Sequence, residues 1–121
     1  DIYAPCALGA TINNDTIERL KCSIIAGAAN NQLADENAQG VRLLERGIVY
    51  APDFLINAGG LINVYSEIAK YNREESFKRT ENIYNTTLDI LMHAEKNNIT
   101  THQAALSVAQ SRIDLARKNK N

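Results

Sequence analysis

The sequence has little of several things that mark familiar classes of protein. Its 121 residues include two cysteines, two prolines and no tryptophan, and the formal net charge is −1. Two cysteines do not form a disulfide framework, which favours a reducing compartment, and we expect the cytoplasm. The small net charge argues against nucleic acid or an anionic membrane as the main partner. No apolar run approaches the roughly 20 residues that cross a bilayer, so no membrane span is expected.

Several catalytic and binding motifs are also absent. The sequence contains no Gly-x-Gly-x-x-Gly, no Gly-x-x-x-x-Gly-Lys-Ser/Thr and no Gly-x-Ser-x-Gly. Neither a pyrophosphate-binding loop nor a hydrolase nucleophile elbow is therefore predicted. His93 and His102 are nine residues apart on different predicted helices, without the cysteines or carboxylates of a metal site. We interpret both as ordinary surface or half-buried residues and predict no metal ion.

What the sequence does have is a hydrophobic content of 45%, enough for one modest folded domain. In its first half, apolar runs at residues 2–4, 23–26 and 48–51 are typical of buried strands. Between them lie a short helix, which Asp15 could cap, and a helix predicted over 36–46, which Gly47 should end. The order strand, helix, strand, helix, strand predicts a parallel sheet with crossover helices.

Polar and glycine-rich residues follow each predicted strand. They occupy residues 5–9, residues 27–32 and, after the third strand, residues 52–53 and 57–60. Because ligands bind at the carboxyl ends of the strands in parallel sheets, all three segments should line one binding edge. Cys6, in the first segment, has two interpretations: a reactive thiol that faces the site, or a small buried packing residue, which we favour.

The second half, from about Asn72, predicts only helices. Asn72 with Glu75 resembles a capping box, and Asn97–Asn98 can end that helix in a left-handed cap. Thr100 and Gln103 start the next helix in the same way. Each helix is expected to bury one apolar stripe, formed by Phe77, Tyr84, Leu88 and Leu91 and by Leu106, Ala109, Ile113 and Ala116. We expect these helices to pack back onto the sheet.

Four segments carry a family resemblance. Residues 1–9, 27–33 and 51–60 resemble, in order and spacing, the later half of the NAD-binding domain of the glutamate, leucine, phenylalanine and valine dehydrogenase superfamily. Residues 71–74 and the helices after them resemble the C-terminal tail of the same superfamily. The resemblance covers essentially the whole chain, and the leucine dehydrogenases are the most similar members.

This resemblance implies a fold and a reaction. The fold is α/β: the second half of a Rossmann-like NAD-binding domain over residues 1–66, with parallel strands and crossover helices, followed by a C-terminal helical tail over 67–121. The reaction is oxidative deamination, in which an L-amino acid gives its α-hydride to NAD and is converted to a 2-oxo acid and ammonia. The resemblance also implies a homo-oligomer, and NAD in preference to NADP.

The resemblance further implies which residues contact ligands. Pro5, Cys6 and Ala7 would lie along the ribose and adenine side of NAD. Asn31 would lie near the nicotinamide ribose and the substrate carboxylate, and Asn57 beside the nicotinamide amide or the substrate. Side-chain amides suit this task because they donate and accept hydrogen bonds without adding charge. The alternative for each position is a residue that only shapes a turn.

The substrate class follows from the helix that comes after Asn57. The resemblance implies that Gly59 and Gly60 let backbone approach the substrate, and that Leu61 and Val64 line its side-chain pocket. In glutamate-specific members a small hydroxyl residue occupies the position of Val64. Burying a carboxylate against valine and leucine would be costly, whereas a branched aliphatic side chain gains contact. We predict leucine, isoleucine and valine as substrates; the alternative is that Leu61 and Val64 belong to the helix core.

The chain holds no catalytic residue that we can assign. In the resembled superfamily the catalytic lysine and aspartate and the pyrophosphate loop belong to segments that have no counterpart here. We therefore expect these 121 residues alone to be inactive, marginally stable and prone to self-association through an open sheet edge and an uncovered apolar face. Two alternatives are a non-catalytic module that binds a nucleotide or a partner chain, and an unrelated α/β enzyme with a site at the same edge.

Overall fold

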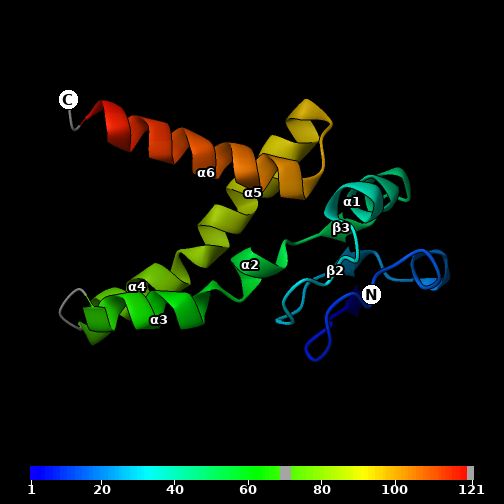
Figure 1. Ribbon diagram of the computed structural model, residues 1–121, viewed down its shortest axis with the longest axis horizontal. Helices are drawn as coiled ribbons and strands as arrows, with labels where there is room; N and C mark the ends of the chain where they lie inside the picture. Colours follow the sequence, from blue (N-terminus) through cyan, green and yellow to red (C-terminus); the bar gives the residue numbers. More distant parts are fainter. Residues whose placement is uncertain (69–71, 120–121) are drawn as a thin grey trace.

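The computed structural model describes residues 1–68 and 72–119 of the chain. In this part, Ile2–Tyr3, Ile24–Ile25 and Val49–Tyr50 form the parallel strands β1, β2 and β3, which lie side by side in chain order. The predicted parallel α/β arrangement is confirmed, although each strand is shorter than its apolar run because only two residues of each make ladder pairs. Figure 1 shows this sheet at one side of the molecule, with the later helices extending from it.

The two faces of the sheet differ in burial. Tyr3, Ile25 and Tyr50 form one row across the strands and face the core, together with Leu43. The other row is Ile2, Ile24 and Val49, whose exposed fractions are 65%, 38% and 43%. Side chains alternate between the faces of a strand, so one face is covered and the other presents apolar side chains to solvent. The expected uncovered face is confirmed for the described residues.

The second crossover is the helix α1 (Glu36–Glu45), close to the predicted 36–46. Asp35 caps it, since its carboxyl accepts the backbone N–H groups of Asn37 and Ala38. Gly47, with φ of 66°, turns the chain away from the helix as predicted. Leu43 on α1 packs over the covered face of the sheet.

The first crossover contains a short 3-10 helix, η1 (Ile17–Arg19). The expectation that Asp15 caps it is wrong. Instead, Asn13 Oδ1 accepts the backbone N–H groups of Asp15 and Thr16, at 3.0 and 3.1 Å. An asparagine side chain at the start of a turn reaches the second and third N–H groups ahead of it, and that geometry excludes Asp15 from the capping position. The guanidinium of Arg46 donates to the carbonyls of Ile17 and Leu20, which ties η1 to the end of α1.

After β3 the described chain is helical, beginning with α2 (Asp53–Ile56) and α3 (Ala58–Ile68). From Asn72, where only helices are predicted, the elements are α4 (Arg73–Glu81), α5 (Ile83–Asn97) and α6 (Thr101–Lys118), as expected. The single helix expected between Asn72 and Asn97 is in fact two, which meet at Asn82. The tail also contacts α1 and α2, through α6 and α5 respectively.

The predicted caps of these helices are largely confirmed. Asn72 accepts the N–H of Glu75 at 3.2 Å, but the Glu75 side chain pairs with Arg79 instead of completing a capping box. Asn98 has φ of 51°, the expected left-handed cap. At the start of α6, Thr100 and Gln103 form the complete, reciprocal capping box.

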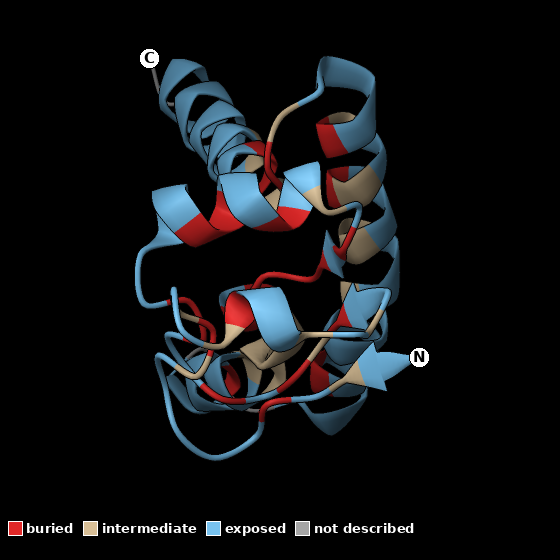
Figure 2. Cartoon of the chain, turned by 90° about the vertical axis from the view of Figure 1, so that its right-hand side faces the viewer, coloured by how far each residue is buried: buried red, intermediate tan, exposed pale blue. Residues whose placement is uncertain are grey.

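The predicted buried stripes of the helices are wrong. Phe77, Tyr84 and Leu88 are exposed, and so are Leu106, Ala109, Ile113 and Ala116. The buried face where α5 crosses α6 is formed by smaller residues and one residue of α2: Leu55, Ile90, Ala94, Ala104 and Ala105. Small side chains let two helices approach closely. The spacing of large apolar residues does not predict a contact of this kind. Figure 2 shows that the C-terminal part of α6 is exposed.

Candidate functional site

The loops after β1 and β2 lie against each other at the carboxyl ends of the strands. The backbone N–H of Ala29 donates to the carbonyl of Pro5 at 3.0 Å. Gly27 makes this approach possible, because a Cβ there would lie 2.2 Å from the Pro5 oxygen. Gly9 has the same role further along, where an added Cβ would lie 2.9 Å from the carbonyl oxygen of Asn30. These two glycines therefore bring the first two predicted site segments together.

The loop after β3 holds the loop after β2 from the other side. Asp53, the first residue of α2, accepts the backbone N–H of Asn31 at Oδ2, at 2.5 Å. Asn57, at the end of α2, donates from Nδ2 to Asn30 Oδ1 at 2.5 Å and to the carbonyl of Ala28 at 3.3 Å. The first and third segments predicted to line one edge thus both contact the second, which lies between them.

Asn31 and Gln32 shape the central loop. Asn31 has φ of 53°, a left-handed conformation that asparagine adopts more readily than most residues. Gln32 is fully buried, and its Nε2 donates to the carbonyls of Gly27 and Ala29 at 2.7 and 2.9 Å. The central loop is therefore braced from inside as well as from both sides.

The predicted cofactor residues occupy different positions in this arrangement. Pro5 is buried against Gly27, whereas Cys6, Ala7 and Asn31 are exposed and Asn57 is half-buried. The preferred interpretation of Cys6 as a buried packing residue is wrong, because Pro5 fills the space at Gly27 and leaves the next side chain outside. The Cys6 sulfur accepts the N–H of Ala28 at 3.5 Å.

The predicted substrate residues lie at the start of α3, directly after Asn57. Leu61 and Val64 are 73% and 53% exposed, so they are not core residues of the described chain. They are three positions apart and share one face of the helix. Gly60 has nothing within 4 Å of the place where a Cβ would be, and Gly59 meets only Thr80 at 3.7 Å. The start of α3 therefore presents an open backbone beside an apolar pair.

Sequence reasoning placed Tyr50 in a buried strand, which the structure confirms, but assigned no role to Asp53. Tyr50 belongs to the core, and burial raises the pKa of its phenol, an effect that the nearby charge of Asp53 increases. Asp53 is only 9% exposed, which is unusual for an aspartate without a specific partner. Its place after a strand and Pro52, in the first turn of a helix, was the available signal, but nothing in the sequence names Asn31 as its partner.

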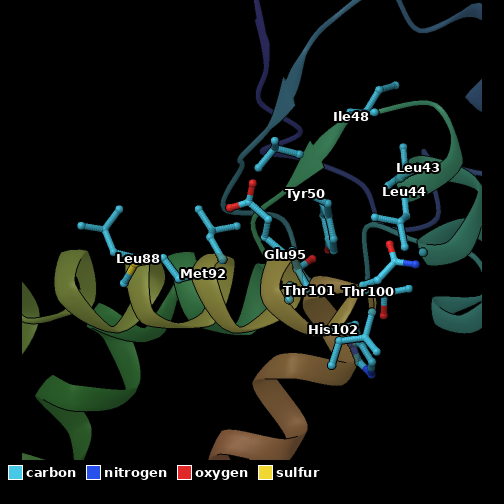
Figure 3. A pocket seen from close by; sticks show the side chains of 17 residues that line it. Leu43, Leu44, Ile48, Tyr50, Leu88, Met92, Glu95, Thr100, Thr101 and His102 are labelled. Atoms are coloured by element: carbon cyan, nitrogen blue, oxygen red, sulfur yellow. The ribbon is translucent and has the colours of Figure 1, made fainter.

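A separate cavity of about 410 Å³ lies between α1, β3, α5 and the start of α6. Figure 3 shows the side chains that line it, with Leu43 and Leu44 from α1 and Leu88 and Met92 from α5. None of the predicted site residues lines this cavity. Parallel sheets bind ligands at the carboxyl ends of their strands, and the three loops described above, not this cavity, are there.

The loops contain polar groups but no charged side chain beside Cys6, Asn31 and Asn57 other than Asp53, whose Oδ2 is engaged by Asn31. Over residues 1–68 and 72–119, no group of three or more metal-ligating side chains is found. The same residues include no helix long and apolar enough to cross a membrane. What this edge can do chemically is bind and orient a ligand through amides and backbone groups.

A parallel α/β sheet whose polar and glycine-rich loops meet at the carboxyl ends of the strands is the arrangement in which open α/β domains bind ligands. The particular family is clear from comparison with known proteins. The sequence model of the glutamate/leucine/phenylalanine/valine dehydrogenase family matches residues 1–120, and the chain belongs to this family.

Individual relatives agree with this assignment. A leucine dehydrogenase of Thermoactinomyces intermedius is 52% identical over the whole chain, which covers 33% of that protein. An L-tryptophan dehydrogenase of Nostoc punctiforme is 50% identical over the whole chain, which covers 34% of it. The crystal structure of L-tryptophan dehydrogenase from Nostoc punctiforme superimposes with a TM-score of 0.94, over 98% of this chain and 35% of that one. The chain thus spans about a third of the length of the relatives it matches.

Proposed function

We propose that this chain is part of an NAD-dependent amino-acid dehydrogenase that oxidatively deaminates branched-chain L-amino acids to 2-oxo acids and ammonia. The observation that carries the proposal is the contact of three loops at one sheet edge, followed directly by the exposed apolar pair Leu61 and Val64 on α3. Membership of the dehydrogenase family supports the reaction class.

The cofactor side of the site is the outer surface of the loops. Pro5, Cys6 and Ala7 would follow the ribose and adenine side of NAD, with Asn31 and Asn57 nearer the nicotinamide. Cys6, Ala7 and Asn31 are exposed, and the amide of Asn31 suits such a ligand because it both donates and accepts hydrogen bonds. When bound, NAD supplies the acceptor for the substrate hydride.

The substrate side is the start of α3. Leu61 and Val64 would contact a branched aliphatic side chain, while the open backbone at Gly59 and Gly60 lets the substrate approach closely. Asn31 would hold the substrate carboxylate. The residues of this chain bind and orient; we assign no proton-transferring group among them, and we expect the 121 residues alone to be inactive.

A second substrate class has its own support. A relative that is 50% identical over the whole chain is an L-tryptophan dehydrogenase. An exposed leucine and valine pair can also contact an aromatic ring. Hydrophobic pockets separate similar side chains by only about 1–3 kcal/mol per methylene, so aromatic substrates are the natural competitor. A non-catalytic module that binds a nucleotide or a partner remains the alternative to any enzymatic role.

The cellular setting belongs to the same proposal. Both cysteines are free, which suits the reducing cytoplasm. The family resemblance supports a homo-oligomer, and we propose no role for nucleic acid or a membrane.

The test is an assay of NADH formation by the complete protein that contains this chain, beside the 121 residues alone. Leucine, isoleucine, valine, phenylalanine, tryptophan and glutamate are compared by kcat/KM. We expect the complete protein to prefer the branched-chain substrates and the short chain to be silent. A preference for tryptophan or phenylalanine would replace the substrate assignment, and the absence of any amino-acid oxidation would refute the enzymatic proposal.

A further inference from the structure

The backbone of Asn31 is held on both sides of its α-carbon. Its N–H donates to Asp53 Oδ2 at 2.5 Å, and its carbonyl accepts the N–H of Ala10 at 2.7 Å. Between these two bonds the residue has φ of 53°, which costs conformational energy for any residue with a side chain. Bonds at both ends are what such a conformation needs in order to persist, and they fix the direction in which the exposed Asn31 side chain leaves the loop.

Asp53 belongs to a helix, α2, that holds the central loop at two places. Asp53 and Asn57 are one turn apart on α2, and the backbone N–H of Asn57 donates to the carbonyl of Asp53 at 2.9 Å. One short helix thus holds two successive residues of the central loop, Asn31 through Asp53 and Asn30 through Asn57. The helix is itself anchored, because Leu55 is buried against α5 and α6.

We propose that Asp53 is a positioning residue: its carboxyl fixes the peptide of Asn31 and so directs the Asn31 side chain toward the ligands. This inference rests on the proposed function and deepens it, since it says how the amide near the substrate carboxylate is held in place. Asp53 itself touches no ligand in this proposal. A carboxyl oxygen suits the task because a hydrogen bond to an acidic group is stronger than one to a neutral acceptor.

A competing explanation is that Asp53 only stabilises the fold. The two differ in coupling. If Asp53 acts by positioning Asn31, then removing the Asp53 carboxyl should matter little once the Asn31 side chain has been removed. If Asp53 only stabilises the fold, the effect of removing its carboxyl should be the same with or without the Asn31 side chain. The experiment is therefore a double-mutant cycle in kcat/KM, in the complete protein that contains this chain, with unfolding midpoints measured for every variant.

The variants are Asp53→Leu, Asp53→Asn, Asn31→Ala and the double variant Asp53→Leu with Asn31→Ala. Asp53→Leu keeps the approximate shape and removes the acceptor, and we expect kcat/KM for the amino acid to fall about tenfold or more. Asp53→Asn keeps an acceptor oxygen and should recover most of the loss. In the Asn31→Ala background, Asp53→Leu should lower kcat/KM less than threefold. Asp89→Leu, an exposed aspartate on α5, is the matched control and should leave kcat/KM unchanged.

Amide hydrogen exchange at Asn31 gives a readout that does not depend on activity. Protection should be lost in Asp53→Leu and kept in Asp53→Asn. If Asp53→Leu does not fold, Asp53→Ala replaces it in the cycle. An active wild type whose two substitutions lower kcat/KM additively, or an Asn31 amide that stays protected in Asp53→Leu, overturns the positioning role. A wild type that oxidises no amino acid overturns the proposed function instead, which is a different result.

Discussion

At the scale of single residues, Gly27 is the glycine of the site that has the least room for a side chain, because Pro5 lies against it. A Cβ added at Gly27 would lie 2.2 Å from the Pro5 oxygen and 2.5 Å from its nitrogen, both backbone atoms that cannot rotate away. Gly27→Ala must therefore separate the first two loops. We expect a loss of about 3 kcal/mol, the upper end for overpacked sites, measured as a shift in the urea midpoint.

The matched control is Gly60→Ala. Gly60 lies in α3, where an added Cβ meets nothing within 4 Å. Alanine is favoured over glycine in a helix, so this substitution should stabilise the protein by about 0.5–1 kcal/mol. Equal midpoints for Gly27→Ala and the wild type would mean that the loops can separate without cost, and the close contact would then have no energetic importance.

Val64 gives the second prediction at this scale. Val64→Ser removes apolar contact and adds a hydroxyl at the position where the family resemblance implies a small hydroxyl residue in glutamate-specific members. In the complete protein we expect kcat/KM for leucine to fall roughly tenfold or more, with a smaller effect for glutamate. Glu67→Gln, exposed on the same helix, is the control and should change neither value. Equal losses for leucine and glutamate would contradict the assignment of Val64 to the side-chain pocket.

Which residues were predictable depended on how local their interactions are. Gly47, Asn98 and the pair Thr100 and Gln103 act on neighbouring backbone, and their roles were correct. Asp53 acts on a residue 22 positions earlier in the chain, and a sequence pattern carries no sign of such a partner. Cys6 was assigned the wrong environment for the same reason, since Pro5 and Gly27 together decide what is covered.

At the scale of elements, α6 begins at a junction where its cap and its packing coincide. Thr100 is buried, its hydroxyl accepts the N–H of Gln103 at 3.1 Å, and its methyl group lies against Gly40 of α1. Thr100→Val keeps the shape and removes the hydroxyl, so the N–H loses its acceptor. We expect a loss of about 0.5–2 kcal/mol in thermal or urea unfolding.

Thr100→Ser separates the two contributions. It keeps the hydroxyl, and hence the cap, and removes only the methyl group at Gly40. We expect it to be less destabilising than Thr100→Val. The reverse order would show that contact between α6 and α1, not the capping box, stabilises this junction.

The helices also show where periodicity stops being informative. Helices were expected after Asn72, and they are present, because caps and the absence of strand patterns are local signals. The buried stripes were wrong because α5 and α6 meet through Ala94, Ala104 and Ala105. Large apolar residues such as Tyr84 and Leu106 show a helix face that is suited to burial. Which face is actually buried depends on where the two helices cross.

At the scale of the whole molecule, much of the exposed apolar surface lies in three groups of residues on the sheet, α3 and α5. It includes one row of the sheet, the pair Leu61 and Val64 on α3, and Leu88 and Met92 on α5. The chain spans about a third of the length of the relatives it matches. Contiguous exposed apolar surface is typical of sites of protein–protein contact.

The sheet row gives the last prediction. Ile2, Ile24 and Val49 lie opposite one another across the three strands and are all exposed. We expect the 121 residues alone to self-associate, with the mean sedimentation coefficient rising with concentration. Ile24→Thr with Val49→Thr keeps residues that favour strands and lowers the apolar area of the row, so association should weaken.

Leu8→Thr is the control for this pair, because Leu8 is exposed in the first loop and lies outside the sheet row. It removes a similar apolar side chain and should leave association unchanged. If Leu8→Thr weakens association as much as the double variant does, total apolar exposure and not the sheet face drives it. If the wild-type chain is a monomer at every concentration and unfolds cooperatively, the uncovered row is tolerated in water, and the expectation of a marginal chain is wrong.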